Sequence, residues 1–264
     1  MEATLIIKWF FLCMKGKNKM KKLKIFLLLI LLSSLIYCVC EVYQIYKEEK
    51  NTADIKKELI ELISIPEVSE EESFRVDFTE LKKINSDIIG WIVIEGTQIN
   101  YPIVQTKNNL FYLNHSYDKK WSGFGSIFMD YKSASNFSDY NTFIYGHHTK
   151  NGSMFGELYK YLVESFYKEH PFFNLYTPDN NYKVEIFSSY VDKSDSDSYR
   201  DQFSSKEDYQ DYLKYIIGKS KYNTNVKVDF IKDKIITLYS CSREGNWAKN
   251  DRYFIHGKLI DLNE

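Results

Sequence analysis

An apolar run near the N-terminus constrains this chain more than any other feature. The run extends from Ile25 to Val42 and is interrupted only by Ser33, Ser34 and Glu41. Together with the next four residues it is long enough to span a bilayer. Six lysines lie within the ten residues directly before the run, at positions 15, 17, 19, 21, 22 and 24. By the positive-inside rule, the N-terminus stays in the cytoplasm and the C-terminal bulk of the chain is exported.

The sequence therefore predicts three parts. Residues 1–24 form a basic cytoplasmic N-terminus, residues 25–46 a transmembrane signal-anchor, and residues 47–264 an extracellular domain. A cleaved signal peptide is the alternative, but the run is long for one and no small-x-small site follows it. A lipobox is disfavoured, because no small residue precedes Cys38 or Cys40 in the usual way. The start of the chain is open, since Met20 and its lysines also resemble a start.

Export makes the cysteine content informative. Three of the four cysteines lie in or before the apolar run, and the exported part holds only Cys241, so it can form no internal disulfide. A thiol outside the cell is exposed to oxidation. A buried structural cysteine is the alternative, but the compartment and a nearby arginine favour a reactive thiol. The net charge of -1 gives no sign of nucleic-acid binding.

The exported part reads as a β protein with few helices. A helix is expected over residues 51–63, and another starts at Asp77, with Glu80 completing a capping box. Short β-branched and aromatic runs follow, at 89–94, 99–104, 125–130, 141–146, 172–177, 182–191, 235–240 and 252–260. A short helix is expected from Ser153, and a helix capped by Ser205 and ended by Gly218 lies in the last crossover. We expect N-terminal helices over residues 47–87 and a closed or nearly closed mixed β-barrel of about eight strands over 88–264.

One group of residues is suited to thiol chemistry. Cys241 ends the strand at 235–240, and a thiol beside a cation is a candidate low-pKa nucleophile. His147 and His148 follow the strand at 141–146, and either could serve as acid and base. Arg252 opens the last strand and Arg243 lies in the loop before it, and either could stabilise an oxyanion. Adjacent residues of an extended chain point opposite ways, so only one histidine is expected to face the thiol.

Several motifs together resemble those of the sortases. The motifs are Y-G-H-H at 145–148, T-L-Y-S-C at 237–241 and N-D-R-Y-F-I-H-G-K-L at 250–259. Three further stretches resemble class B sortases in particular, namely G-W-I-V-I-E-G-T-Q-I-N-Y-P-I-V-Q at 90–105, G-S-I-F-M-D at 125–130 and G-S-M-F-G-E-L at 152–158. The resemblance covers the chain from about Asn51 to its C-terminus.

The resemblance implies a sortase β-barrel and a cysteine transpeptidase, and the single N-terminal anchor fits it. No metal-ligand cluster is visible in the sequence, and no cofactor is expected. In the family, the cysteine attacks a sorting signal of a secreted protein after threonine, and an amine of a cell-wall precursor or another acceptor resolves the thioacyl enzyme. The family's histidine follows Y-G, which selects His147, and its arginine opens the last strand, which selects Arg252. We infer that Cys241 is the nucleophile, His147 the acid and then base, and Arg252 the group that binds the threonine carbonyl and the oxyanion.

The resemblance also implies residues that contact the signal peptide. Matching motifs transfer this role to Asn109, Leu113, Tyr145 and, less directly, Tyr199. The usual T-L-S-T-C of the family is T-L-Y-S-C here, so Tyr239 and Ser240 replace a serine and a threonine in the expected peptide groove. We expect these two positions to affect which signal is recognised.

Two other classes of function fit parts of the sequence. One is an extracellular cysteine peptidase of another fold, although papain-like enzymes place cysteine before histidine, the reverse of the order here. The other is a non-catalytic surface-binding module, in which Cys241 would be buried and inert. The sequence does not give the sorting signal, the acceptor amine, the client proteins or the oligomeric state.

Overall fold

A computed structural model describes residues 19–61, 63–64, 75–240 and 250–262. The chain divides into two compact units, Met1–Ile55 and Lys56–Glu264. The predicted nucleophile Cys241 and the alternative cation Arg243 lie outside the described residues.

A single helix, α2 (Lys19–Glu61), forms the described part of the first unit and continues into the second. Its stretch Met20–Lys47 reaches a mean hydropathy of 2.6 and buries none of that apolar surface in the protein, which fits a membrane anchor or a signal sequence. The hydroxyls of Ser33 and Ser34 donate to backbone carbonyls three residues earlier, at 2.8 and 2.9 Å. The helix expected over 51–63 is the end of α2 rather than a separate element, because no glycine or proline interrupts the chain between residues 17 and 65.

Within the described residues, eight strands of the second unit close into a mixed β-barrel, which confirms the predicted fold class. Their order around the barrel is β10-β8-β7-β3-β4-β5-β6-β9. The strands are β3 (Ile88–Val93), β4 (Asn100–Val104), β5 (Ile127–Met129), β6 (Asn141–Gly146), β7 (Phe172–Tyr176), β8 (Asn181–Lys193), β9 (Ile235–Ser240) and β10 (Asp251–Asp261). The pairs β4–β5 and β6–β9 are parallel, and the other neighbours in the barrel are antiparallel.

The remaining elements of the second unit precede the barrel or lie between its strands. They are β1 (Ile63–Ser64), β2 (Arg75–Val76), α3 (Phe78–Ile84), η1 (Phe111–Leu113), η2 (Leu158–Leu162), α4 (Glu164–Glu169) and α5 (Lys206–Gly218). The predicted caps are present, since Asp77 accepts from the first turn of α3 and Ser205 from that of α5. The helix expected from Ser153 begins only at Leu158, and α4 was not predicted.

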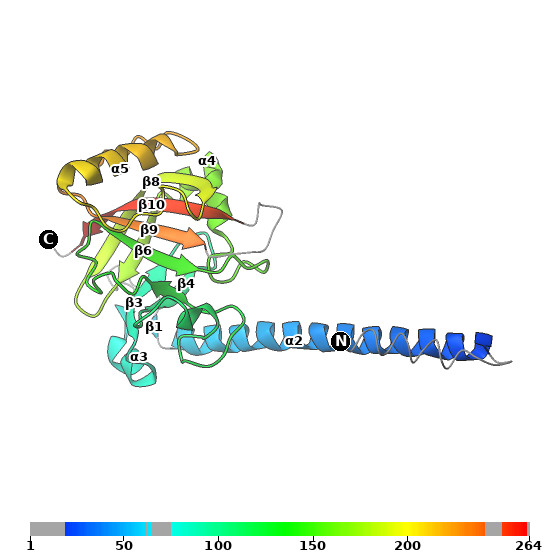
Figure 1. The fold of residues 1–264 in the computed structure, drawn as a ribbon. Coiled ribbons are helices and arrows are strands. Elements are labelled where there is room, and N and C mark those ends of the chain that lie inside the picture. Colours follow the sequence, from blue (N-terminus) through cyan, green and yellow to red (C-terminus); the bar gives the residue numbers. More distant parts are fainter. Residues whose placement is uncertain (1–18, 62, 65–74, 241–249, 263–264) are drawn as a thin grey trace. The chain divides into compact units, whose positions relative to one another are not determined.

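Two neighbouring strands of the barrel, β6 and β9, are buried on both faces. Alternate residues such as Ile144 and Leu238 belong to the apolar core. Residues of opposite parity are buried too, and α5, whose buried residues are Tyr209, Tyr212, Leu213 and Ile216, packs on this side near the start of β6, where Tyr212 is hydrogen-bonded to Asn141. Figure 1 shows α5 alongside β8 and β10, on the outside of the barrel.

Candidate active site

Two parallel strands end together at one edge of the barrel. β6 and β9 pair along their whole length and finish with Gly146 opposite Ser240. Both arrowheads point the same way in Figure 1. His147 follows Gly146 directly, and Cys241 follows Ser240. The fold therefore brings together the two strand ends that carry the predicted acid and the predicted nucleophile in the sequence.

The third predicted catalytic residue opens the neighbouring strand. β10 runs antiparallel to β9, with Phe254 opposite Tyr239, so β10 begins at the edge where β9 ends. Arg252 is the second residue of β10 and is half-buried. Its Nη1 donates to the carbonyl of Asp251 at 2.8 Å. A guanidinium is thus held at the same barrel edge as His147.

The ring of His147 is oriented by a backbone carbonyl. Its Nε2 lies 2.8 Å from the carbonyl oxygen of Leu113. A carbonyl oxygen can only accept, so Nε2 carries a hydrogen in this contact, and Nδ1 is the ring nitrogen that is left for another partner. This contact connects the predicted acid to Leu113, the last residue of η1.

The second histidine has different neighbours. His148 forms an isolated bridge with Met154. Its ring centroid lies 5.3 Å from that of Tyr253 and 6.2 Å from that of Tyr159. The two adjacent histidines therefore contact different parts of the chain, as the alternation of an extended backbone requires.

Packing explains the glycine before His147. A Cβ on Gly146 would lie 2.5 Å from Cδ1 of Ile127 and 2.7 Å from ring atoms of Phe155. Phe155 is fully buried, and its backbone N–H donates to the carbonyl of His147 at 2.9 Å. The end of β6 can pack this closely only without a side chain.

Beside this edge lies an aromatic cluster of five rings: Phe143, Tyr145, Tyr199, Tyr239 and Phe254. Tyr239 is central, because its ring centroid lies 5.1 to 6.2 Å from those of the other four. Tyr145 and Tyr239 are almost fully buried, whereas 36% of Tyr199 is exposed. Tyr199 is therefore the member of the aromatic cluster that presents most surface to solvent.

A buried carboxylate organises the hydroxyls of the aromatic cluster. Asp130 Oδ2 accepts from Tyr145 Oη at 2.6 Å and from Asn109 Nδ2 at 2.8 Å. Because the Tyr145 hydrogen goes to Asp130, Tyr199 Oη donates to Tyr145 Oη, 2.6 Å away. Burial, followed by the nearby Tyr199 and Asp130, raises the pKa of Tyr145 far above its usual range. Tyr145 therefore stays a neutral hydrogen-bonding group.

Comparison with known proteins identifies the family. The sortase domain model matches residues 92–260. Sortase B of Listeria monocytogenes is 43% identical over 186 residues, covering 70% of this chain and 75% of that protein. Sortase B of Staphylococcus aureus is 33% identical over 223 residues, covering 84% of this chain and 91% of that protein. The chain belongs to the sortase B family.

Solved structures of sortase B agree with this assignment. A Bacillus anthracis sortase B in complex with AAEK1 superposes with a TM-score of 0.71 and 35% identity, covering 82% of this chain and 99% of that one. A sortase B–substrate complex from S. aureus gives a TM-score of 0.66 and 36% identity, covering 70% and 85%.

The family assignment decides between the functional classes that the sequence left open. The chain is a sortase B cysteine transpeptidase that anchors surface proteins. This rules out a cysteine peptidase of another fold and a non-catalytic binding module.

The residues predicted to contact the peptide differ in how much of their surface is exposed to solvent. Asn109 and Leu113 are half-buried, and Tyr199 is exposed. Tyr239 and Ser240, the two departures from the family motif, are 7% and 1% exposed. Tyr239 packs inside the aromatic cluster, so in this structure its ring supports Tyr199 more than it meets solvent.

Sequence reasoning missed one residue of this site. Asp130 ends the G-S-I-F-M-D motif, which was used to recognise the family but was given no role. The available signal was a carboxylate directly after an apolar strand, where an acid needs hydrogen-bond donors. In the structure those donors are Asn109 and Tyr145, together with the backbone N–H of Lys132 at 2.9 Å.

Proposed function

We propose that this enzyme cleaves the C-terminal sorting signal of a surface protein after threonine and transfers the protein to a cell-wall amine. The reaction proceeds through a thioacyl intermediate on Cys241. The observation that carries the proposal is the parallel pairing of β6 and β9, which puts the residues before His147 and Cys241 opposite each other. Similarity to a substrate complex of S. aureus sortase B supports a peptide substrate.

The proposed acylation step begins with the Cys241 thiolate. Its sulfur attacks the threonine carbonyl carbon, a C–S bond forms, and the C–N bond after threonine breaks. The His147 imidazolium gives its Nδ1 proton to the leaving amine, while the Leu113 carbonyl holds the Nε2 hydrogen. Arg252 donates hydrogen bonds to the threonine oxygen as negative charge develops on it.

The proposed second step transfers the acyl group. The acceptor amine attacks the thioester carbon, the C–S bond breaks, and the Cys241 thiolate leaves. His147 takes the proton that the amine loses, which restores the imidazolium. A thiolate and an imidazolium in one site favour each other's charged form, so the resting pair is ready for another cycle.

Mass spectrometry of Cys241 tests the proposal. The full chain in detergent is mixed with peptides of the N-P-x-T and P-x-T-G kinds, with and without triglycine as the amine. We expect an adduct on Cys241 with the mass of the peptide up to threonine, which triglycine converts into a peptide–triglycine product. Cys241→Ala should form no adduct. If the peptide were hydrolysed and the amine changed neither the rate nor the products, transpeptidation would be refuted.

Two matched pairs of variants test the other roles. We expect His147→Ala to lower kcat by about 10²- to 10⁴-fold, and His148→Ala to have a much smaller effect. Arg252→Ala should lower kcat by about 10²- to 10³-fold. If Arg252→Ala kept full activity while Arg243→Ala lost it, the assignment of the arginine would be wrong.

The proposal includes a location for the enzyme. Residues 1–24 stay in the cytoplasm, residues 25–46 span the membrane, and residues 47–264 form the extracellular catalytic domain. The apolar stretch Met20–Lys47 of α2 and the lysines before residue 25 support this arrangement. The proposed clients are therefore secreted proteins that carry sorting signals.

A further inference from the structure

The backbone on both sides of Tyr199 is held by buried side chains. The Tyr212 hydroxyl donates to the carbonyl oxygen of Ser198 at 2.9 Å, and Asn141 Nδ2 donates to that of Arg200 at 2.8 Å. Asn141 Nδ2 also donates to Tyr212 Oη at 3.1 Å. Asn141 comes from β6 and Tyr212 from α5, so the barrel and its covering helix together hold the 198–200 segment.

A chain of hydrogen bonds behind Asn141 fixes its orientation. Thr237 Oγ1 donates to Asn141 Oδ1 at 2.7 Å, and His256 Nδ1 lies 2.8 Å from Thr237 Oγ1. Since the threonine hydrogen is already used, His256 Nδ1–H is the donor to Thr237, and His256 Nε2 accepts from Tyr190 Oη at 2.9 Å. Burial lowers the pKa of His256 to about 3, so the ring is neutral, as this direction requires.

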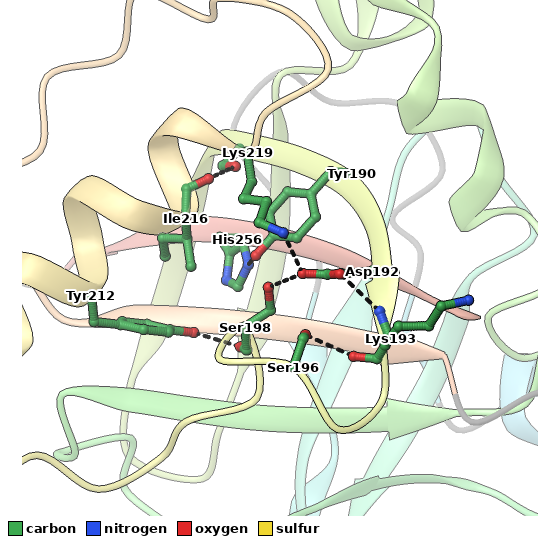
Figure 2. Close-up of polar contacts among 10 residues, drawn as sticks. Tyr190, Asp192, Lys193, Ser196, Ser198, Tyr212, Ile216, Lys219 and His256 are labelled. Carbon is green, nitrogen blue, oxygen red and sulfur yellow. Dashed lines mark hydrogen bonds and ion pairs between the residues drawn. The ribbon is translucent and has the colours of Figure 1, made fainter. Parts of the chain in front are cut away.

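We call these five residues (Tyr190, His256, Thr237, Asn141 and Tyr212) the positioning network. All five are at most 4% exposed. Figure 2 shows Tyr190 beside His256, and Tyr212 reaching Ser198. Each member of the positioning network is hydrogen-bonded to the next, and the donors all point the same way along the network. The last hydrogen bonds are donated to the carbonyl oxygens of Ser198 and Arg200, on either side of Tyr199. A fully satisfied buried network of this kind rigidifies what it holds.

A carboxylate in an ion pair also holds this segment. Asp192 Oδ2 accepts from Ser198 Oγ at 2.7 Å and from Lys219 Nζ at 2.9 Å (Figure 2). Ser198 is fully buried, whereas Tyr199 next to it is 36% exposed. The backbone is thus fixed on the protein side, and the Tyr199 ring is carried over Phe143 and Tyr239, at centroid distances of 4.8 and 5.4 Å.

We propose that Asn141 and Tyr212 are positioning residues that hold Tyr199 in the aromatic cluster as a preformed wall of the peptide site. The proposal rests on the proposed function, because it assigns the exposed face of Tyr199 to the sorting-signal peptide. Asn141 opens β6, at the opposite end of the strand from His147, and Tyr212 is hydrogen-bonded to Asn141. Their loss lets the 198–200 segment move, so the peptide must order it on binding, and that cost raises KM while leaving the chemical step unchanged.

The test compares two tyrosines of α5. Tyr212→Phe removes the hydroxyl that holds Ser198. Tyr209→Phe is the matched control, because Tyr209 is 1% exposed on the same helix but donates to the carbonyls of Tyr140 and Asp233, at 3.1 and 2.9 Å. We expect Tyr212→Phe to raise KM for the sorting-signal peptide by about five- to tenfold. Its kcat and the rate of Cys241 alkylation by a small thiol reagent should stay at the wild-type values, and Tyr209→Phe should change none of these.

A double-mutant cycle separates positioning from a general loss of stability. In a Tyr199→Ala background there is no ring to position, so Tyr212→Phe should add less than a twofold change in KM. Thr237→Val should raise KM as Tyr212→Phe does. Thr237→Ser keeps the hydroxyl, so its KM should stay at the wild-type value. If Tyr212→Phe raises KM equally with and without Tyr199, or if Tyr209→Phe matches it, the proposal is wrong.

Hydrogen exchange gives a measurement that needs no substrate. Exchange of the amides of residues 196–203 should be at least tenfold faster in Tyr212→Phe than in wild type, and unchanged in Tyr209→Phe. If the wild-type enzyme formed no thioacyl adduct, the proposed function would fail, while this exchange would still report whether the segment is held. Unchanged exchange in Tyr212→Phe would overturn the positioning role whatever the substrate is.

Discussion

At the scale of single residues, a glycine controls the contact that orients His147. Gly125 has a φ of +59°, in the left-handed region that side chains disfavour. A Cβ there would lie 2.5 Å from the carbonyl oxygen of Tyr112 and 2.7 Å from that of Leu113. The second oxygen is the one that accepts from His147. The close approach of the two backbones is therefore possible only with glycine.

We predict that Gly125→Ala reduces activity by disturbing His147. The added methyl group must push the Leu113 carbonyl away, so the imidazole loses the acceptor that fixes its tautomer. We expect kcat to fall about tenfold or more, with a smaller change in KM and a loss of about 1–3 kcal/mol in the free energy of unfolding. Steady-state kinetics on a sorting-signal peptide and urea unfolding measure the two effects.

Gly218 supplies the control for this substitution. It is the last residue of α5, and a Cβ built on it would meet nothing within 4 Å. Gly218→Ala should leave kcat and KM unchanged and should not destabilise the protein, since alanine is the better helix former. An equal loss of kcat in both variants would show that the effect of Gly125→Ala is not specific to the Leu113 carbonyl.

At the scale of elements, charged groups attach α5 and its flanking segments to the barrel. Lys219, just after α5, pairs with Asp192 of β8 at 2.9 Å. Burial alone would raise the pKa of Asp192. Hydrogen bonds from Lys219 and Ser198, from the Lys193 backbone and from Ser196 outweigh burial and lower this pKa to about 2. Asp192 is thus ionised down to strongly acidic pH, and it joins the strand, the helix end and the 198–200 segment.

We predict that this carboxylate contributes to the acid sensitivity of the fold. Because its pKa is lower in the folded than in the unfolded protein, its contribution to stability is present above about pH 4 and is lost as the pH falls towards about 2. Asp192→Asn should therefore be less stable than wild type at pH 6, with a gap that narrows between pH 4 and pH 2. Urea midpoints across this range measure the gap.

Asp211 provides a matched control on α5. It pairs with Lys214 at 2.9 Å, but its side chain is 76% exposed, and exposed pairs of this kind contribute little. Asp211→Asn should leave the urea midpoint near the wild-type value at every pH. A constant gap between Asp192→Asn and wild type from pH 6 to pH 2 would contradict the assignment of the low pKa to Asp192.

At the scale of the whole molecule, local patterns predicted the strands but not how they pair. β6 and β9 have the bounds expected from the sequence, because polar residues bracket short β-branched and aromatic runs. Their parallel pairing joins segments almost a hundred residues apart, and no local pattern carries that register. The pairing of β9 with β10 was easier to anticipate, since the two strands follow each other in the sequence.

The candidate site was predictable to a similar degree. Family motifs selected His147 and Arg252, and the fold brings both to one barrel edge, while Cys241 remains a prediction. The positioning network was not anticipated, because Asn141, Thr237 and His256 looked like isolated polar residues in apolar strands. Their common feature is that they share the barrel face covered by α5, which becomes visible only when the three strands lie side by side.

The division of the chain into two units leads to a last prediction about anchoring. The unit Lys56–Glu264 contains the barrel and α5, and the apolar stretch Met20–Lys47 buries no surface in the protein. A chain starting at Lys56 should therefore fold, with a thermal midpoint within a few degrees of that of the full chain in detergent. Its kcat/KM on a soluble peptide should match that of the full chain. In cells this shorter chain, exported by a cleavable signal, should anchor few surface proteins, because it is no longer held at the membrane across which its clients are secreted.

Membrane extraction and protease treatment test the same arrangement in the full chain. An uncleaved anchor predicts that the full-length protein resists alkaline carbonate extraction, and that protease added to cells without walls removes the barrel but leaves a short N-terminal fragment. Mass spectrometry of the N-terminus distinguishes the alternative. A mature protein that begins beyond residue 46 and is released by carbonate would identify residues 25–46 as a cleaved signal, and the enzyme would then need another means of staying at the membrane.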